Sequence, residues 1–181
     1  MAYRQLPTAS RRIGFEIETP SEVEVRPGEV VRCSEERDGR TIGELEVSVF
    51  HAALVIDRDG ILEEKVASAI EQAREPGARV LPAIPVTLPG ASGYRADLEL
   101  VRPMGTPQAE LPFTYVFAMA PNDLSLDGGL IVTVRCASPQ WPAADAILRS
   151  LRILSRRGRV PANDSDEARA KLPLVGGRGD D

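Results

Sequence analysis

The stretch ADAILRSLRIL, residues 144–154, decides the fold. Its apolar residues recur at intervals of three and four, which is typical of one face of an amphipathic helix. They are Ala144, Ile147, Leu148, Leu151 and Leu154. Pro142 suits the first turn of this helix, and Asp145 lies near the positive end of its dipole. Burying four such aliphatic side chains is worth on the order of 6 to 12 kcal/mol before entropy is subtracted, so the helix needs a sheet to cover.

Before this helix the apolar pattern has mostly period two, which predicts β-strands. The strand-like segments are residues 13–20, 23–25, 31–33, 44–49, 79–88, 92–101, 111–120 and 129–137. Residues 57–77 change to helical period, with the stripe Leu62, Val66, Ala69, Ile70 and Ala73. Asp59 or Gly60 can cap this mid-chain helix, and Pro76 ends it.

The order strands, helix, strands, helix predicts an α+β fold. We expect a largely antiparallel sheet of about six to seven strands, covered by the mid-chain helix and the C-terminal helix. Residues 1–155 would form this single domain. Residues 156–181 are rich in glycine, proline and charge without a sustained period, which predicts a disordered tail.

Composition argues against several classes of partner. The 181 residues carry a net charge of -5, and the pI is about 5.1, which disfavours nucleic acid and anionic membrane surfaces. The first residues lack the apolar run of a secretory signal, and no stretch approaches the roughly 20 apolar residues of a membrane span. We therefore expect a cytoplasmic protein. Its two cysteines, Cys33 and Cys136, lie in strand-like runs, as buried free thiols or, if their strands pair, as a bridge.

Residues with catalytic potential are few. His51 is the single histidine, and Asp57 and Asp59 are close to it in sequence, but a turn and a helix cap are sufficient roles for these aspartates. The chain has no CxxC pair for a zinc site of the usual kind and no glycine-rich phosphate loop. We predict no enzymatic activity, no cofactor and no metal.

Six motifs follow one another in an informative order. A first strand ends in proline (GFEIETP, residues 14–20), and a later strand (LEVSVF, residues 45–50) leads to a helix in mid-chain (ILEEKVASAIEQARE, residues 61–75). A glycine-led strand (ASGYRADLEL, residues 91–100), a long aromatic hairpin (residues 111–137) and a closing ILxSL pattern (residues 147–151) complete the order. Over roughly residues 10–155 this layout resembles the PsbP-like family, which joins the photosystem II extrinsic P subunit, the Ran-binding Mog protein and bacterial relatives.

The resemblance implies a PsbP-like sandwich and a binding function. Members of the family act as adaptors, assembly factors, lipoproteins and secretion chaperones, and the family supplies no shared catalytic residues. The chain departs from the pattern at one place. Many relatives carry a tryptophan soon after the first-strand proline, where this chain has Ser21, Glu22 and Val23, and its single tryptophan is Trp141.

If the apolar sides of the strands all meet the helices, their other sides form one polar, acid-rich face. Its members would be Glu16, Glu18, Glu44, Glu46, Arg95, Asp97, Glu99, Thr114, Thr133 and Arg135. Ordinary solvation can explain such a face, because antiparallel sheets often have one wet side. The functional interpretation is a docking surface for a basic segment. We predict a non-enzymatic protein-binding adaptor or assembly module, with the seven charged residues from Glu16 to Glu99 as candidate binding residues.

Two alternatives stay open. A secretion chaperone of the same fold would hold an apolar helix of an effector protein in an exposed apolar groove. A small-ligand protein or enzyme would have a pocket walled by Phe113, Tyr115 and Phe117 together with Tyr94, although aromatic rows at period two are more often part of a core.

Overall fold

A computed structural model describes residues 2–6, 13–26, 28–52, 57–101, 110–122 and 128–155. The strands in these ranges are β1 (Ala2–Leu6), β2 (Ile13–Thr19), β3 (Val23–Arg26), β4 (Val31–Arg37), β5 (Arg40–His51), β6 (Ala78–Val80), β7 (Ile84–Leu88), β8 (Ala91–Leu100), β9 (Phe113–Pro121), β10 (Gly128–Cys136) and β11 (Arg152–Ser155). The helices are α1 (Arg58–Ala73) and α2 (Pro142–Ser150). The predicted tail, residues 156–181, lies outside the described residues.

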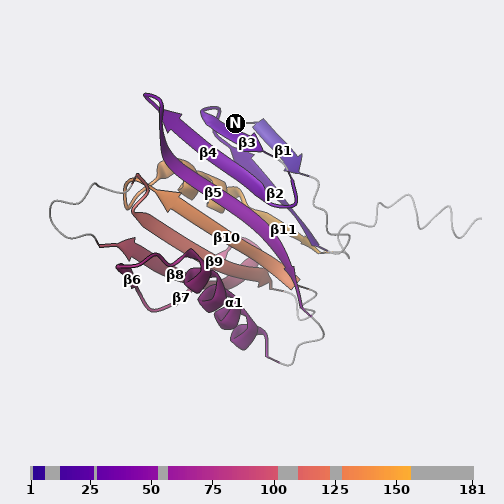
Figure 1. Ribbon diagram of the computed structural model, residues 1–181. Helices are drawn as coiled ribbons and strands as arrows, with labels where there is room; N and C mark the ends of the chain where they lie inside the picture. Colours follow the sequence, from indigo (N-terminus) through magenta and orange to yellow (C-terminus); the bar gives the residue numbers. More distant parts are fainter. Residues whose placement is uncertain are drawn as a thin grey trace, which may run out of the picture.

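The larger of two sheets has eight antiparallel strands in the order β3-β4-β5-β10-β9-β8-β6, and β7 also pairs with β8 (Figure 1). The predicted α+β class with a largely antiparallel sheet is therefore confirmed. The described ranges hold eleven strands where about six to seven were expected, because β1 and β11 were not predicted and residues 79–88 do not form one strand. Residues 81–83, which include Pro82, separate β6 from β7, since proline interrupts a hydrogen-bonded ladder.

A smaller sheet of three strands has the order β1-β2-β11. The first predicted strand, β2, belongs to this sheet and not to the larger one, which corrects the expectation of a single sheet. Phe15 of β2 pairs with Leu6 of β1 on one side and with Ile153 of β11 on the other. The small sheet thus joins the two ends of the described chain.

Helix α2 is shorter than the sequence pattern predicts. It ends at Ser150, Leu151 has the extended backbone of a C-cap, and residues 152–155 continue as β11. Leu154, predicted to belong to the helical stripe, instead pairs with Gly14. The side-chain oxygen of Ser150 accepts a hydrogen bond from the backbone N–H of Glu18 at 2.8 Å. This contact ties the end of α2 to β2, so the chain can leave the helix and pair with that strand.

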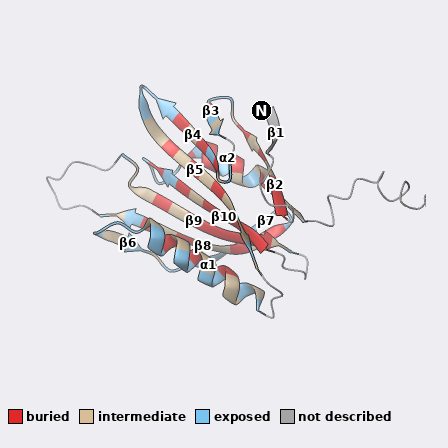
Figure 2. Ribbon diagram, turned by 45° about the vertical axis from the view of Figure 1, so that its right-hand side comes forward, coloured by how far each residue is buried: buried red, intermediate tan, exposed pale blue. Residues whose placement is uncertain are grey.

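Helix α1 covers β8 and β9 on one face of the larger sheet (Figures 1 and 2). Its buried residues Leu62, Val66 and Ile70 confirm the predicted stripe. They pack on mostly small side chains, namely Ala96, Leu98, Val116, Ala118 and Ala120. The N-cap is Asp57, whose side chain accepts from the N–H of Gly60 at 3.0 Å, and not Asp59 or Gly60 as predicted.

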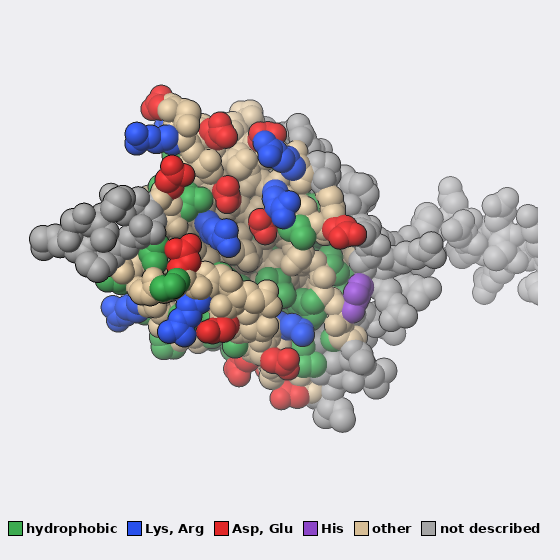
Figure 3. All heavy atoms as spheres, viewed as in Figure 1, with side chains coloured by type: hydrophobic (Ala, Val, Ile, Leu, Met, Phe, Trp, Pro, Cys, Tyr) green, Lys and Arg blue, Asp and Glu red, His purple; other side chains and the backbone are tan. Residues whose placement is uncertain are grey.

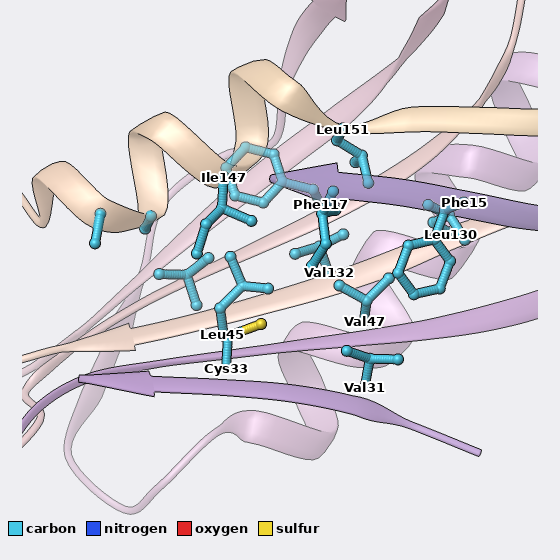
Figure 4. Packing of buried hydrophobic residues seen from close by; sticks show 14 of the residues in the cluster. Phe15, Val31, Cys33, Leu45, Val47, Phe117, Leu130, Val132, Ile147 and Leu151 are labelled. Carbon is cyan, nitrogen blue, oxygen red and sulfur yellow. The ribbon is translucent and has the colours of Figure 1, made fainter. Parts of the chain in front are cut away.

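Helix α2 and β2 cover the opposite face of the larger sheet. Phe15 from β2 and Ile147 from α2 meet Leu45, Val47 and Phe117 of the sheet there (Figure 4). Strand β9 is consequently buried on both sides, with its odd-numbered residues toward α2 and its even-numbered residues toward α1. The order of layers is α1, the larger sheet, and then α2 together with the small sheet.

Cys33 and Cys136 are buried free thiols in the core on the α2 side. They lie on β4 and β10, which flank β5 on opposite sides, so their strands do not pair and the alternative of a bridge is wrong. Burial raises the pKa of each thiol to about 11. In the described part of the chain, no helix is long and apolar enough to cross a membrane.

Candidate functional site

The seven charged residues predicted to share a binding face lie on three different surfaces. Glu16 and Glu18 alternate with the buried residues of β2 and so belong to the outer side of the small sheet. Glu44 and Glu46 of β5 lie on the α1 side of the larger sheet, because Leu45 between them faces the other core. The expectation of one continuous face is therefore wrong.

The remaining three, Arg95, Asp97 and Glu99, lie on the α2 side of β8. Arg95 pairs with Phe117 and Asp97 pairs with Tyr115 in the register of β8 and β9. The error has a simple physical cause. The apolar side of β8 faces α1 whereas the apolar side of β5 faces α2, so the polar sides of these two strands face in opposite directions.

The side of β4, β5 and β10 next to α1, here called the open face, has mixed charge. Acidic and basic side chains are interspersed on the side of the molecule that Figure 3 shows. From the strand register, the open face presents Arg32, Glu44, Glu46, Thr133 and Arg135. Arg32 and Glu46 form an ion pair at 3.0 Å, with both side chains substantially exposed. Such a pair adds little stability. The open face is thus not the acid-rich surface expected from the sequence.

One corner of the open face is hollowed beside the last turn of α1. This α1 pocket has a volume of about 330 Å³. It is lined by Glu44, Ala73, Glu75, Leu98, Leu100, Glu110, Leu111, Pro112, Thr114 and Arg135. Four of these form a single row across four strands, because Leu98 pairs with Thr114, Thr114 with Arg135, and Arg135 with Glu44.

Several polar groups of the α1 pocket have no partner within the described ranges. Thr114 is only 5% exposed as a residue, and its hydroxyl makes no hydrogen bond to any described residue, but the oxygen itself is open to water at the pocket. Arg135 and Glu44 are direct cross-strand neighbours, yet neither has an ion pair with a described residue. The same holds for Glu75 and Glu110. As far as the described residues go, the pocket therefore offers three carboxylates and one guanidinium without ion pairs, and one hydroxyl at its wall.

A second hollow, here called the aromatic hollow, lies between α2 and strands β7 to β10. Its volume is about 190 Å³. It is lined by Leu88, Arg95, Tyr115, Phe117, Val134, Pro139, Trp141, Ala144, Asp145, Leu148 and Arg149. Two residues of the predicted pocket wall, Tyr115 and Phe117, are among them. Tyr94 packs instead against the cluster under α1, on the other face of the sheet.

Arg95 is held in one orientation at the wall of the aromatic hollow. Its guanidinium carbon lies 4.4 Å from the centre of the Tyr115 ring and 5.5 Å from that of Phe117. Its Nη2 donates to Asp97 at 3.0 Å, and its Nε donates to the other carboxylate oxygen. The Tyr115 hydroxyl donates to the carbonyl of Pro139 at 2.6 Å, and burial raises the pKa of Tyr115 to about 12.

Trp141 forms the end of the aromatic hollow and is itself anchored. Its indole N–H donates to Glu35 at 2.7 Å, and Glu35 also accepts from Arg37 at 3.0 Å. The indole covers Gly43, where a Cβ atom would fall 2.4 Å from the ring. No sequence motif placed Trp141 in a site. Its occurrence as the single tryptophan directly before a helix was the only available signal.

The residues with catalytic potential, His51 and Asp57, lie outside both hollows. His51 is exposed at the end of β5, and Asp57 is occupied as the cap of α1. Among the residues that the structure describes, no three His, Cys, Asp or Glu side chains are placed to hold a metal ion. The described residues thus line the α1 pocket and the aromatic hollow, on opposite faces of the larger sheet, and a third hollow of about 370 Å³ beside Trp141, Glu35 and Arg37. No protein-family model and no curated protein matches the chain.

Proposed function

We propose that the protein is a non-enzymatic adaptor or assembly module that binds a basic segment of another protein in the α1 pocket. The main support is the charge of the pocket. The pocket combines three carboxylates without ion pairs, from Glu44, Glu75 and Glu110, with an apolar floor. Arg135 offsets only part of their charge, so the pocket stays net negative.

A lysine or arginine side chain matches these surroundings. Its methylene stem can lie along Leu98, Leu100 and Pro112, while its charged head reaches the carboxylates at the rim. The C-terminal end of α1 lies beside the pocket, and its dipole favours a cation there, although Arg74 at the C-cap already offsets part of that charge.

The Thr114 hydroxyl adds a reason for a donor at the base of the pocket. The Thr114 hydroxyl is not among the fully buried atoms that lack a partner, so it meets water in the pocket, and a ligand donor can replace that water. An ammonium or guanidinium group is a donor without acceptor capacity, and it can donate to the threonine oxygen. Arg135 can then donate hydrogen bonds to Glu44, its cross-strand neighbour, or to a carbonyl group of the partner.

The PsbP-like sandwich is part of the proposal. A helix on each face of an antiparallel sheet and the order of elements along the chain support it. Members of that family are adaptors and assembly factors, in keeping with a binding role. The chaperone alternative requires an exposed apolar groove. The large apolar side chains that are exposed in the described part of the chain, Val80, Ile84 and Val101, lie near the sheet edge of β6 and β7, and we therefore favour the adaptor.

The test compares proteins captured from the source cell by three forms of the chain. The pocket variant is Glu44→Gln/Glu75→Gln/Glu110→Gln. The control is Glu46→Gln/Glu63→Gln/Glu64→Gln, which removes the same charge outside the pocket. We expect one partner to be retained by the wild type and the control, lost by the pocket variant and released by salt. Equal recovery by all three forms would refute the proposal, provided that thermal unfolding shows each variant to be folded.

A further inference from the structure

We propose that the aromatic hollow binds a free aromatic α-amino acid. This site lies on the α2 side of the larger sheet, away from the α1 pocket, and does not depend on the adaptor function. The ligand class follows from three features of the hollow: buried apolar lining residues, an ordered cation among them, and two exposed lining residues of opposite charge.

The base of the hollow suits a planar apolar group. Phe117, Val134 and Trp141 are almost fully buried there, while Tyr115 and Leu148 are half-buried and keep apolar surface open to solvent. A ring that enters the hollow removes this surface from water, which favours binding. A volume of about 190 Å³ is below the usual range of ligand pockets, so the hollow suits a ligand of the size of one amino acid and not a folded segment of another protein.

Arg95 supplies a preorganised site for a carboxylate. Its guanidinium is stacked on Tyr115 and Phe117 and uses Nε and Nη2 to bind Asp97. Its remaining nitrogen, Nη1, has no hydrogen-bond partner within the described ranges. Because the side chain is already ordered, a ligand that binds Nη1 loses little additional conformational entropy.

The rim favours a zwitterion over a simple acid. Asp97 already balances the charge of Arg95, so the remaining charges are Asp145 and Arg149 on α2. These two residues are one helical turn apart, both are exposed, and neither has an ion pair with another described residue. A ligand carboxylate can pair with Arg95 and Arg149, and a neighbouring ammonium group can pair with Asp145. An α-amino acid carries both groups on one carbon, next to its side chain.

Trp141 gives a direct readout, because it is the only tryptophan of the chain and lines the hollow. The full chain is titrated with L-phenylalanine, 3-phenylpropionate, 2-phenylethylamine and L-leucine while Trp141 fluorescence is followed, and calorimetry repeats the measurement. We expect saturable binding of L-phenylalanine, with roughly tenfold weaker binding of each other probe. No saturable signal with L-phenylalanine up to about 10 mM, or equal affinity for all four probes, would overturn the proposal.

Two variants test the assigned roles. Leu148→Phe fills the hollow with a ring of its own and should abolish binding. Asp145→Asn changes an exposed side chain, and it should weaken L-phenylalanine roughly tenfold while leaving 3-phenylpropionate unchanged. An equal effect on both probes, or full binding by a folded Leu148→Phe protein, contradicts the inference. The Glu44→Gln/Glu75→Gln/Glu110→Gln variant should bind L-phenylalanine like the wild type. The proposal for this site and the proposal for the α1 pocket can therefore be refuted independently.

Discussion

The indole ring of Trp141 covers Gly43 so closely that a Cβ atom at Gly43 would fall 2.4 Å from ring carbon Cδ2. Gly43→Ala should therefore displace the indole and lower the free energy of unfolding by about 1 to 3 kcal/mol, the usual cost of overpacking a core. Urea unfolding measures this change, and the emission maximum of Trp141 should shift toward that of a more exposed indole.

The control for this substitution is Gly90→Ala. Gly90 has a φ of 75°, and no described atom lies within 4 Å of a Cβ placed there, so its cost comes from the backbone alone. The Gly90→Ala protein should keep the wild-type emission of Trp141. If Gly43→Ala also left the emission unchanged, the ring would not need the space above Gly43.

Glu35 should couple energetically to Trp141 through the buried hydrogen bond of 2.7 Å between them. In a double-mutant cycle with Glu35→Leu and Trp141→Phe, we expect a coupling free energy of about 1 to 2 kcal/mol. The leucine variant leaves the indole N–H without its partner, whereas Glu35→Gln keeps an acceptor oxygen and should cost less. Additive effects of the two substitutions would contradict a role of this contact in anchoring the indole.

Local patterns predicted most elements of this fold, but not β1 or β11, and not how the elements combine. The stripe of α1 was correct because Leu62, Val66 and Ile70 are set by helical periodicity within the segment itself. The end of α2 depends on the contact between Ser150 and Glu18, which lie 132 positions apart. No periodicity within residues 144–154 records that contact, so the strand β11 was read as helix.

The candidate site was missed for a related reason. Alternation identifies which residues of a strand share a side, but it does not say which layer covers that side. Glu44 and Arg95 were placed on one face because each alternates with apolar residues along its own strand. The two helices were assumed to cover the same face of the sheet. Trp141 was overlooked as a site residue because its importance comes from Gly43 and Glu35, on strands far away in sequence.

Arg58 should contribute substantially to the attachment of α1 to the sheet. Its Nη2 lies 3.0 Å from the carbonyl of Ser92 and 2.9 Å from that of Ala120, at the ends of β8 and β9. Hydrogen bonds from a charged donor are among the stronger ones, so Arg58→Ala should cost about 2 kcal/mol in the free energy of unfolding. Hydrogen exchange should also show earlier opening of α1 in this variant.

The matched control lies at the other end of the same helix. Arg74 makes only an exposed ion pair with Glu71 at 3.5 Å, so Arg74→Ala should change stability by less than about 0.5 kcal/mol. Equal effects of the two substitutions would mean that the carbonyl contacts of Arg58 add nothing beyond its charge.

Alkaline pH should destabilise the protein through its buried thiols. Burial raises the pKa of Cys33 from 9.0 to about 11, and that of Cys136 by the same amount. Between these two values the unfolded chain has released the thiol protons that the folded chain still holds, so unfolding becomes more favourable as pH rises. The stabilisation is complete below about pH 9 and is lost as pH approaches about 11, with a slope of at most about 1.4 kcal/mol per pH unit for each thiol.

Cys33→Ala should remove half of this pH dependence. Alanine cannot ionise, so the loss of stability between about pH 8 and about pH 10 should be smaller by about 1 kcal/mol than in the wild type, although the variant starts from a lower stability because a cavity replaces the sulfur. Urea unfolding at both pH values measures the difference. Ser34→Ala, at the next position of β4, carries no titrating group and should follow the wild-type slope. A Cys33→Ala curve parallel to that of Ser34→Ala would mean that the Cys33 thiol ionises as readily in the folded protein as in the unfolded chain.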